Sequence, residues 1–207
     1  MIGIGITTTP KRGHIFDLCF KQIMKHTKGA TITAHNDTEG KGVAYSKNQC
    51  LKILKDCDKI FLFDDDCFPI KDGWDQIFTG HHQMYLGNWG KIKQSATIDG
   101  ITFFNNCAGV LMYLSKEAVE KVGAFNEAFG RYGLEHAEYS ERVNKEMLTG
   151  GKFQSPSNAK EFIHSLDYDG PFEGIEVVPN LTAKEGNECI SFAQKQWVKE
   201  PVIYRPL

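Results

Sequence analysis

The chain has 207 residues, of which 41% are hydrophobic and 24% charged, and its formal net charge at pH 7 is −2. This composition is typical of one folded domain with a hydrophobic core, and it excludes the disordered and fibrous classes of protein. The small negative charge gives no sign of the strongly basic surface that many nucleic-acid-binding proteins carry. No segment approaches the roughly 18 consecutive apolar residues of a membrane-spanning helix, so we expect no membrane span.

The first 63 residues alternate between strand-like and helix-like segments. The apolar runs "IGIGIT", "ATITAH" and "KIFLF" predict strands, and "HIFDLCFKQIMKH" and "VAYSKNQCLKILKDC" have the apolar spacing of helices. In chain order we expect a strand at 2–7, a helix at 14–26, a strand at 30–35, a helix at 43–57 and a strand at 59–63. This β-α-β-α-β order favours an α/β fold with a parallel sheet covered by helices on both faces.

The pattern is less regular further along the chain. We expect a helix at 73–86, strands at 101–106 and 109–115, a serine-capped helix at 115–123 and a helix at 135–151. His81 and His82 fall in the first of these helices, on a surface where we expect no role for them. After residue 151, Pro, Gly, Asn and Ser accumulate, which predicts loops and short elements wrapped on the domain.

The six cysteines are scattered and form no C-x-x-C pair. Their spacing is unlike that of a zinc site, and four of them lie in patterns typical of a core helix or strand. We therefore expect reduced thiols in a cytosol-like compartment. The apolar part of the N-terminal segment "MIGIGITTTPKRG" is too short, and wrongly flanked, for a signal peptide.

Three consecutive aspartates, Asp64, Asp65 and Asp66, follow the third strand directly. Ligands of open α/β sheets bind beyond the carboxyl ends of the strands, and clustered carboxylates repel one another unless a cation joins them. If the strand geometry persisted, Asp64 and Asp66 would point to one side and Asp65 to the other. A solvated acidic turn is the alternative interpretation. The position after the third strand favours a Mg²⁺ or Mn²⁺ site that neutralises a departing diphosphate.

The stretch "FLFDDDCFP" resembles the D-x-D signature of nucleotide-sugar-dependent glycosyltransferases with the GT-A fold, and three further segments follow the order of that family. "GITTTPKR" (5–12) is similar to the strand and loop that hold the nucleotide base. "GVAYSKNQCLKIL" (42–54) looks like the helix start beside the nucleotide. Residues 107–143 look like the acceptor-side strand, helix and acidic helix. The resemblance covers about residues 2–143.

This resemblance implies a GT-A (Rossmann-like) α/β fold with a mixed, mainly parallel sheet in a single domain, 1–207. Within it, 1–106 would be the nucleotide-binding half, 107–164 the acceptor and catalytic half, and 165–207 a tail. The implied activity is metal-dependent transfer of a sugar from a nucleotide-diphosphate donor, a UDP-sugar first, to an acceptor hydroxyl, with Mn²⁺ or Mg²⁺ as cofactor. Small stand-alone relatives occur in bacteria and viruses, which implies the cytoplasm of a bacterium or of a virus's host cell.

The sequence does not identify the acceptor or the oligomeric state. A glycan, a protein, a small molecule or a hydroxymethylated DNA base are all candidate acceptors, no membrane is expected, and the oligomeric state is unknown. A sugar nucleotidyltransferase is an alternative on the same fold, ranked lower because "TTTPKRG" lacks a glycine run. A non-catalytic nucleotide-sugar-binding module is a third possibility. A basic groove around Lys91 and Lys93 would favour DNA as the acceptor.

For the nucleotide, the resemblance implies a pocket built from the ends of the first two strands and from the second helix. The implied residues are Thr7, Thr8 and Arg12 for the base, Asp37 for base or ribose, and Lys47 and Asn48 for the phosphates or ribose. A plain Asx turn is the alternative for Asp37, and solvent-facing helix positions are the alternative for Lys47 and Asn48.

For the metal and the sugar, the resemblance implies that Asp66 binds the cation directly and that Asp64 lies near the ribose and the metal. Asp65 would be the weakest contributor to nucleotide-sugar binding. His164 would complete the metal shell from the tail, with Asp167 and Asp169 as lesser candidates. Gly109 would let the sugar approach the backbone, unless it marks a strand bulge.

The segment "GLEHAEYSERV" departs from many relatives, which carry Glu-Asp where this chain has Glu135 and His136. His136 would be either a general base or a hydrogen-bond donor to the sugar, and Glu135 either an acceptor for a sugar hydroxyl or a base. Whether the transfer inverts or retains configuration stays open. Glu138 and Arg142 are four residues apart, which predicts an ion pair within the helix.

Overall fold

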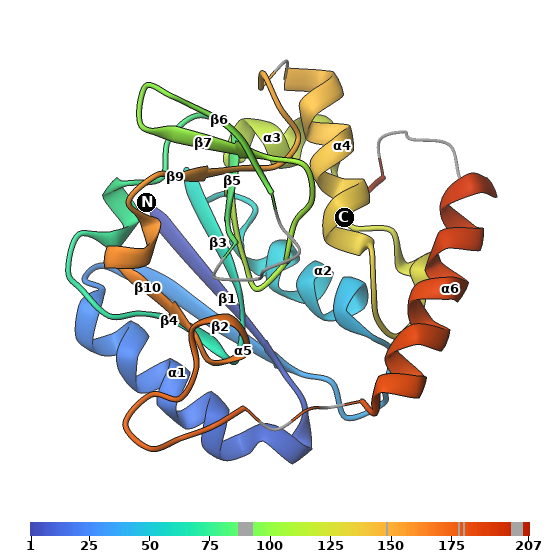
Figure 1. Cartoon of the computed structure of the whole chain (residues 1–207), viewed down its shortest axis with the longest axis horizontal. Coiled ribbons are helices and arrows are strands. Elements are labelled where there is room, and N and C mark those ends of the chain that lie inside the picture. The colour runs from blue at the N-terminus through green and yellow to red at the C-terminus, as the bar shows by residue number, and fades with distance from the viewer. Residues whose placement is uncertain (87–92, 148, 178, 180, 200–204) are drawn as a thin grey trace.

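The computed structural model describes residues 1–86, 93–147, 149–177, 179, 181–199 and 205–207. Its centre is a five-stranded sheet in the order β2-β1-β3-β8-β5 (Figure 1). β1, β2 and β3 are parallel, and β8 runs antiparallel to both β3 and β5. The predicted α/β class with a mixed, mainly parallel sheet is confirmed. These strands are β1 (Ile2–Thr8), β2 (Ala30–Asn36), β3 (Lys59–Asp64), β5 (His82–Tyr85) and β8 (Leu111–Ser115).

The remaining strands form two smaller sheets, in the orders β10-β4 and β6-β7-β9. The helices are α1 (Gly13–His26), α2 (Val43–Leu54), α3 (Lys116–Val122), α4 (Glu135–Met147), α5 (Leu166–Asp169) and α6 (Ala183–Lys199). The short strands are β4 (Cys67–Pro69), β6 (Gln94–Ile98), β7 (Ile101–Phe104), β9 (Gln154–Pro156) and β10 (Ile163–Ser165). Single 3₁₀ turns are η1 (Pro10–Arg12), η2 (Trp74–Gln76), η3 (Glu127–Phe129) and η4 (Ala159–Glu161).

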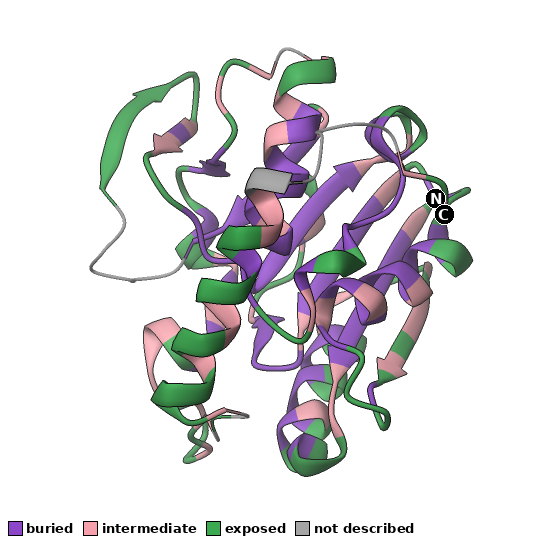
Figure 2. Ribbon diagram, turned by 90° about the vertical axis from the view of Figure 1, so that its right-hand side faces the viewer, coloured by how far each residue is buried: buried purple, intermediate pink, exposed green. Residues whose placement is uncertain are grey.

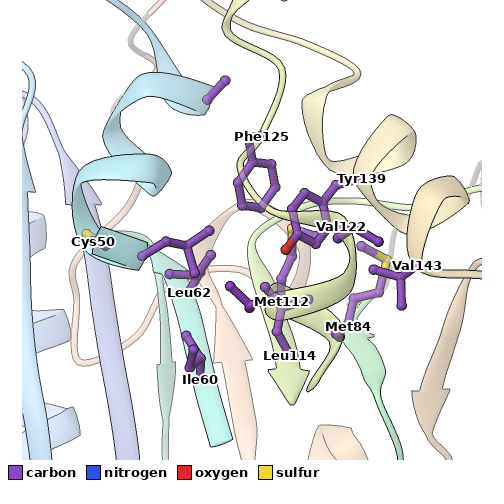
Figure 3. Close-up of a cluster of buried hydrophobic side chains, with 14 of the residues drawn as sticks. Cys50, Ile60, Leu62, Met84, Met112, Leu114, Val122, Phe125, Tyr139 and Val143 are labelled. Carbon is purple, nitrogen blue, oxygen red and sulfur yellow. The ribbon is translucent and has the colours of Figure 1, made fainter. Parts of the chain in front are cut away.

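Both faces of the sheet are covered, because alternate residues of each central strand point to opposite sides. Ile60 and Leu62 of β3 pack with α2, α3 and α4, and Figure 3 shows this cluster between the helices and the strands. Phe61 and Phe63 face the opposite way, toward α1 and the ribbon of β4 and β10. Figure 2 shows the buried residues gathered on the central strands. The region of the aspartates therefore rests on a rigid, doubly covered scaffold.

The alternating glycines of "IGIGIT" let α2 approach β1 closely. A Cβ atom at Gly5 would lie 2.6 Å from Cβ of Cys50, and a Cβ atom at Gly3 would lie 2.9 Å from Sγ of Cys57. Both distances are shorter than carbon and sulfur atoms tolerate without a shift of the helix. The two glycines thus fix the distance between α2 and the sheet.

Two expectations from the sequence are wrong. Residues 73–86 form the turn η2 and the strand β5 rather than a helix, because β5 pairs with β8 and all four of its residues are buried. The tail after residue 151 also contains a regular element, the 17-residue helix α6. Thr182 and Glu185 form a capping box at its start, with the Thr182 N–H donating to Oε2 of Glu185 over 2.8 Å.

Other expectations from the sequence concern the cap of α3, the cysteines, membrane-spanning segments and the basic groove. Ser115 caps α3 by accepting from the Ala118 N–H, as predicted. All six cysteines are free, and five of them are buried. Among the described residues, no helix combines the length and apolar character that crossing a membrane requires. Lys91, which the sequence suggested as part of a basic groove, lies outside the described residues.

His82 is a buried link between elements rather than a surface residue, which corrects the expectation from the sequence. Its Nδ1 lies 2.9 Å from the Tyr113 carbonyl oxygen and its Nε2 lies 2.8 Å from Oγ of Ser140. Burial lowers the pKa of His82 to about 4. The imidazole is therefore neutral in the folded chain at neutral pH.

We expect this histidine to make the folded state less stable in mild acid. The unfolded chain takes up a proton on His82 near its ordinary pKa of 6.5, whereas the folded chain does so only near 4. The free energy of unfolding should therefore fall as the pH drops from 6.5 to 4, by about 1.4 kcal/mol per pH unit at most from this residue. Urea unfolding of the parent and of His82→Asn across this range measures the effect, and the two curves should converge toward low pH. Parallel curves would contradict it.

Candidate active site

The candidate site forms where several elements meet at the carboxyl edge of β1 and β3. The register pairs Thr7 with Asp64 at the ends of these strands. Because β8 is antiparallel, its first residues arrive at the same edge, where the Asp64 N–H donates to the Val110 carbonyl over 2.8 Å. The first turns of α2 and α4 also begin here. The chain thus brings four separate segments to the three aspartates.

Each of the three aspartates has a different polar partner. Asp64 accepts from the Thr7 hydroxyl over 3.0 Å, and Asp65 accepts from the Thr8 hydroxyl over 2.5 Å. Nη2 of Arg12 lies 3.0 Å from Oδ1 of Asp65 and 2.6 Å from Oδ2 of Asp66. The expected alternation of Asp65 and Asp66 is wrong, because β3 ends at Asp64 and the next two residues turn together toward Arg12.

Asp66 has one oxygen that no donor reaches. Its side chain is almost fully buried, and its Oδ1 accepts from no N–H or O–H group of the described residues. Asp167 of α5 lies against Asp66, at a distance that allows a hydrogen bond if one of the two carboxyl groups is protonated. Burial raises the pKa of Asp66, and the negative charge of Asp167 raises it further. Without a proton or a cation, these two groups repel each other.

His164 is not brought to this pair. It lies in β10, where it pairs with Phe68, and its Nε2 is 2.9 Å from the Gly170 carbonyl oxygen. Its ring packs against Phe68 and Phe172. Its role as a metal ligand stays a prediction, and Asp167, a lesser candidate in the sequence, is the tail residue that the structure places beside Asp66.

These residues fit a hard divalent cation in part. Among the described residues no three His, Cys, Asp or Glu side chains form a ready-made metal shell. Mg²⁺ and Mn²⁺, however, commonly bind one or two carboxylates and complete their shell with water and substrate phosphates. The unpartnered oxygen of Asp66 and the adjacent Asp167 supply such a pair of oxygen ligands. The donor set therefore suits a cation that arrives with a diphosphate.

Lys47 is a buried cation at the centre of the site. Its side chain is fully buried, which excludes the solvent-facing alternative, and its Nζ donates to the Gly109 carbonyl over 3.1 Å. The same Nζ lies 3.5 Å from Oδ1 of Asp64 and 3.7 Å from Oε1 of Glu135. Burial would lower the pKa of Lys47, but Asp64 and Glu135 raise it above its ordinary value. Lys47 is therefore charged and joins α2, β3 and α4.

Asp37 and Asn48 are engaged in holding loops. Asp37 accepts from the N–H groups of Lys41 and Gly42, so its carboxylate closes the loop before α2, across four and five residues rather than the two residues of an Asx turn. Asn48 exchanges hydrogen bonds with the backbone of Phe125 and donates to Oε1 of Glu127. Neither geometry tests nucleotide binding, which stays a prediction for both.

Glu135 and His136 form an ion pair at the start of α4, with Nδ1 of His136 3.1 Å from Oε1 of Glu135. Burial would raise the pKa of Glu135, but His136 and Lys47 lower it to about 2. Burial would lower the pKa of His136, but Cys107 and Glu135 raise it to about 10. At neutral pH the pair is thus a carboxylate and an imidazolium, which favours a donor role for His136 over that of a general base.

Gly109 is explained by the ring of His136. A Cβ atom at Gly109 would lie 2.6 Å from Cγ and 2.7 Å from Nδ1 of His136. The backbone φ of Gly109 is not in the left-handed region, so the need for glycine here is space rather than conformation. The histidine ring thus covers the Cα atom of Gly109. The sequence had suggested either a bound sugar or a strand bulge as the reason for this glycine.

We expect Gly109→Ala to displace the His136 ring and to lower the free energy of unfolding by about 1–3 kcal/mol, the range for overpacking a buried site. Thermal unfolding measures this change. The matched control is Gly109→Ala combined with His136→Gly, which removes both the ring and the Cβ atom that would lie 2.9 Å away, so its stability should match that of His136→Gly alone. A double variant as unstable as the sum of the two single variants would assign the glycine another role.

Three side chains of this site were absent from the sequence-based list of binding and catalytic residues, whereas Asp167 was a lesser candidate in it. Cys107, which neighbours His136, is the first of the three. Burial raises the pKa of Tyr132 to about 12, with Glu135 and Asp64 adding to it, and Tyr168 is affected by Asp167 in the same way. The only signal in the sequence that could have identified these two tyrosines is that each lies close to an acidic residue of the site. That Tyr168 lies near the aspartates depends on how the tail folds.

The buried Glu138 and Arg142 pair belongs to the scaffold. Nε of Arg142 donates to Oε1 of Glu138 over 2.9 Å, which confirms the predicted ion pair within α4. Arg142 also donates to the carbonyl oxygens of Val122 and Ala124. A surface hollow of about 610 Å³ lined by Lys11, Arg131 and Thr182, among others, contains none of the carboxylates of the site.

Known proteins show only distant similarity to the chain. No protein-family model and no curated protein sequence matches it. Glycosyltransferases are among the solved structures that resemble it, as the motifs predict. The galactosyltransferase LgtC in complex with donor and acceptor sugar analogs is 10% identical, with a TM-score of 0.37 over 77% of this chain and 70% of that chain.

Two further solved structures cover more of the chain. The glycosyltransferase GlyE of Streptococcus pneumoniae TIGR4 is 10% identical, with a TM-score of 0.45 over 98% of this chain. The chain spans 64% of the GlyE structure, less than two thirds of its length. The inositol-1-phosphate CTP transferase from T. maritima is 12% identical, with a TM-score of 0.39 over 93% of this chain and 77% of that chain. At these values the likeness assigns neither a family nor a substrate.

Proposed function

We propose that the chain is a metal-dependent glycosyltransferase that moves a sugar from a nucleotide-diphosphate donor, a UDP-sugar first, to an acceptor hydroxyl. The observation that carries this proposal is the buried oxygen of Asp66 without a donor, next to Asp167 and beyond the carboxyl end of β3. This is the edge of an α/β sheet where nucleotides bind. A cation held there would meet the diphosphate of such a donor.

The charges of the site support a substrate that brings both a cation and an anion. Five carboxylates, on Asp64, Asp65, Asp66, Glu135 and Asp167, face three positive groups, on Arg12, Lys47 and His136. When all five carboxyl groups are ionised they exceed the positive groups by two, and one Mn²⁺ or Mg²⁺ ion would balance this excess. Asp66 and Asp167 would hold this ion, and it would stabilise the negative charge of the departing diphosphate.

The protein's own side chains have distinct tasks in this proposal. Lys47, held by Gly109 and Asp64, keeps the floor of the site rigid and positively charged. His136 donates a hydrogen bond toward the sugar, and Glu135 orients His136 through their 3.1 Å contact. Thr7 and Thr8 hold Asp64 and Asp65 in place at the end of β1. The acceptor hydroxyl would attack the anomeric carbon beside this pair, the bond from that carbon to the diphosphate would break, and the hydroxyl proton would pass to Glu135 or to the departing diphosphate.

An assay of UDP release tests the proposal. The chain is incubated with a panel of UDP-sugars and Mn²⁺, with and without candidate acceptors that include glycans, proteins and hydroxymethylated DNA. Release of UDP that requires Mn²⁺ and increases with one acceptor is the expected result. Release of pyrophosphate from a sugar phosphate and UTP would instead indicate the nucleotidyltransferase alternative. Binding without turnover of any donor would indicate a non-catalytic module.

A further inference from the structure

We propose that Arg12 is a built-in competitor of the divalent cation: its guanidinium neutralises Asp65 and Asp66 when the metal is absent, and it must leave Asp66 when the metal binds. The inference rests on the metal site of the proposed function. It goes beyond that function because it assigns to Arg12 a change of partner. The freed guanidinium would then bind the donor diphosphate, which guanidinium groups recognise with two parallel hydrogen bonds.

The first argument is the position of Arg12. Its side chain is 9% exposed, and one terminal nitrogen, Nη2, lies between Oδ1 of Asp65 and Oδ2 of Asp66. It therefore compensates the carboxylate that the proposal assigns to the metal. A divalent ion at Asp66 and a guanidinium 2.6 Å from the same carboxylate would repel each other. A divalent ion on Oδ1 and the guanidinium on Oδ2 therefore compete for the charge of one carboxylate.

The second argument is that Arg12 leaves part of its hydrogen-bonding capacity without a partner. Both of its ion pairs go through Nη2, and its buried Nε–H finds no acceptor among the described residues. On the other side of the contact, Oδ1 of Asp66 finds no donor. A buried donor and a buried acceptor that both lack a hydrogen-bond partner in one ion pair each cost free energy. This pair is therefore not arranged for maximum stability.

Arg142 shows how the same fold builds a permanent buried arginine. Its Nε and Nη2 donate to the two carboxylate oxygens of Glu138, and its Nη1 and Nη2 donate to two carbonyl oxygens. This fork-like contact satisfies the guanidinium from all sides. Arg12 and Arg142 are similarly buried, so burial does not explain the difference. An exchange of partners at Arg12 explains it.

The third argument is that Arg12 lies between two exposed residues, Lys11 and Gly13, so solvent is next to its backbone. Arg12 ends the short turn η1, and a Cβ atom at the following Gly13 would meet no atom within 4 Å. Departure of the guanidinium alone would leave Asp66 buried and unpaired, which is costly. Arrival of the metal removes that cost. We therefore expect metal binding to be weak without nucleotide and strongly enhanced by a diphosphate.

Binding of Mn²⁺ in the absence of nucleotide tests the inference, followed by the electron paramagnetic resonance signal of the free ion. Arg12→Gln should bind Mn²⁺ at least ~10-fold more tightly than the parent, which corresponds to about 1.4 kcal/mol. The matched control is Lys11→Gln, which removes the same charge from the exposed neighbouring residue. Its affinity should stay within about twofold of the parent, because exposed charges are screened by solvent.

Chemical rescue separates competition from a general loss of charge. In Arg12→Ala, millimolar guanidinium chloride should weaken Mn²⁺ binding back toward the parent value, and sodium chloride at equal ionic strength should not. If Arg12→Gln is poorly folded by circular dichroism, Arg12→Lys, which keeps the charge, should bind Mn²⁺ with intermediate affinity. Equal or weaker Mn²⁺ binding by Arg12→Gln, or no effect of guanidinium, would overturn the inference.

The outcome is distinguishable from failure of the proposed function. Tighter Mn²⁺ binding by Arg12→Gln together with no UDP release from any donor would leave the competition standing and remove the transferase. UDP release that depends on Mn²⁺, with unchanged metal affinity in Arg12→Gln, would remove the competition alone.

Discussion

Replacing Asp66 with asparagine is expected to abolish Mn²⁺-dependent binding of UDP and to lower kcat/KM for sugar transfer by about 10²–10³-fold, as the loss of one electrostatic contact to a developing charge does in other enzymes. The amide removes the negative charge that would hold the cation and keeps the shape of the side chain. The substitution relieves the repulsion between Asp66 and Asp167 but also removes the charge that faces Arg12, so circular dichroism and urea unfolding of the variant accompany the binding measurement. Titration calorimetry with UDP, with and without Mn²⁺, measures the binding, and UDP release measures the rate.

Asp65→Asn is the matched control, since it is the same change at the next residue of the same turn. Asp65 is bound by the Thr8 hydroxyl and Arg12, and the contacts of Asp167 are with Asp66 rather than with it. Burial raises the pKa of Asp65 to about 7, so part of the parent protein already carries a neutral group there at neutral pH. We expect a loss of less than about tenfold. Equal losses in the two variants, or parent-like behaviour of Asp66→Asn, would remove Asp66 from the metal site.

Replacing Lys47 with methionine is expected to produce the largest loss of stability. Its side chain is fully buried, and its removal leaves Asp64 and Glu135 without their shared cation and the Gly109 carbonyl without a donor. Breaking a buried ion pair by removing one partner costs about 3–5 kcal/mol. Urea unfolding of the parent and the variant measures this difference.

Lys52→Met provides the control, because Lys52 lies on the same helix α2 and is exposed. Its change in stability should stay within about 0.5 kcal/mol, as for most surface substitutions. A further variant, Lys47→Met combined with Glu135→Gln, should recover part of the loss, since one of the two unpaired carboxylates becomes neutral. If Lys47→Met were as stable as Lys52→Met, the buried cation would have no structural role.

The first half of the fold follows from the sequence because its elements are local. Alternating apolar runs and helical spacing give β1, α1, β2 and β3 to within one residue at each end, whereas the helix expected at 43–57 ends at Leu54. Segment 73–86 fails for the opposite reason. Its strand β5 exists only through pairing with β8, about thirty residues away, and no local pattern encodes that partner.

The sequence predicts the part of the candidate site that depends on the end of β3. It does not predict the part that depends on contacts between distant segments. The position of the aspartates after β3 follows from the chain order, but the partner of each depends on where the strand stops. β3 stops at Asp64, so Asp65 and Asp66 turn together to Arg12. The positions of His164 and Asp167 depend on the pairing of β10 with β4, which no local sequence pattern encodes. β10 pairs His164 with Phe68, and the chain then turns so that Asp167 reaches Asp66.

The short ribbon of β4 and β10 links the site to a distant part of the sequence. Ser165 pairs with Cys67, and the Leu166 N–H donates to the Asp66 carbonyl over 2.8 Å, so the acidic turn and the segment after residue 163 are held by the same few hydrogen bonds. Opening of this ribbon would separate Asp167 from Asp66. Amide hydrogen exchange at Ser165 and Leu166 would therefore slow when a ligand occupies the turn, and these two amides become reporters of occupancy that need no knowledge of the acceptor.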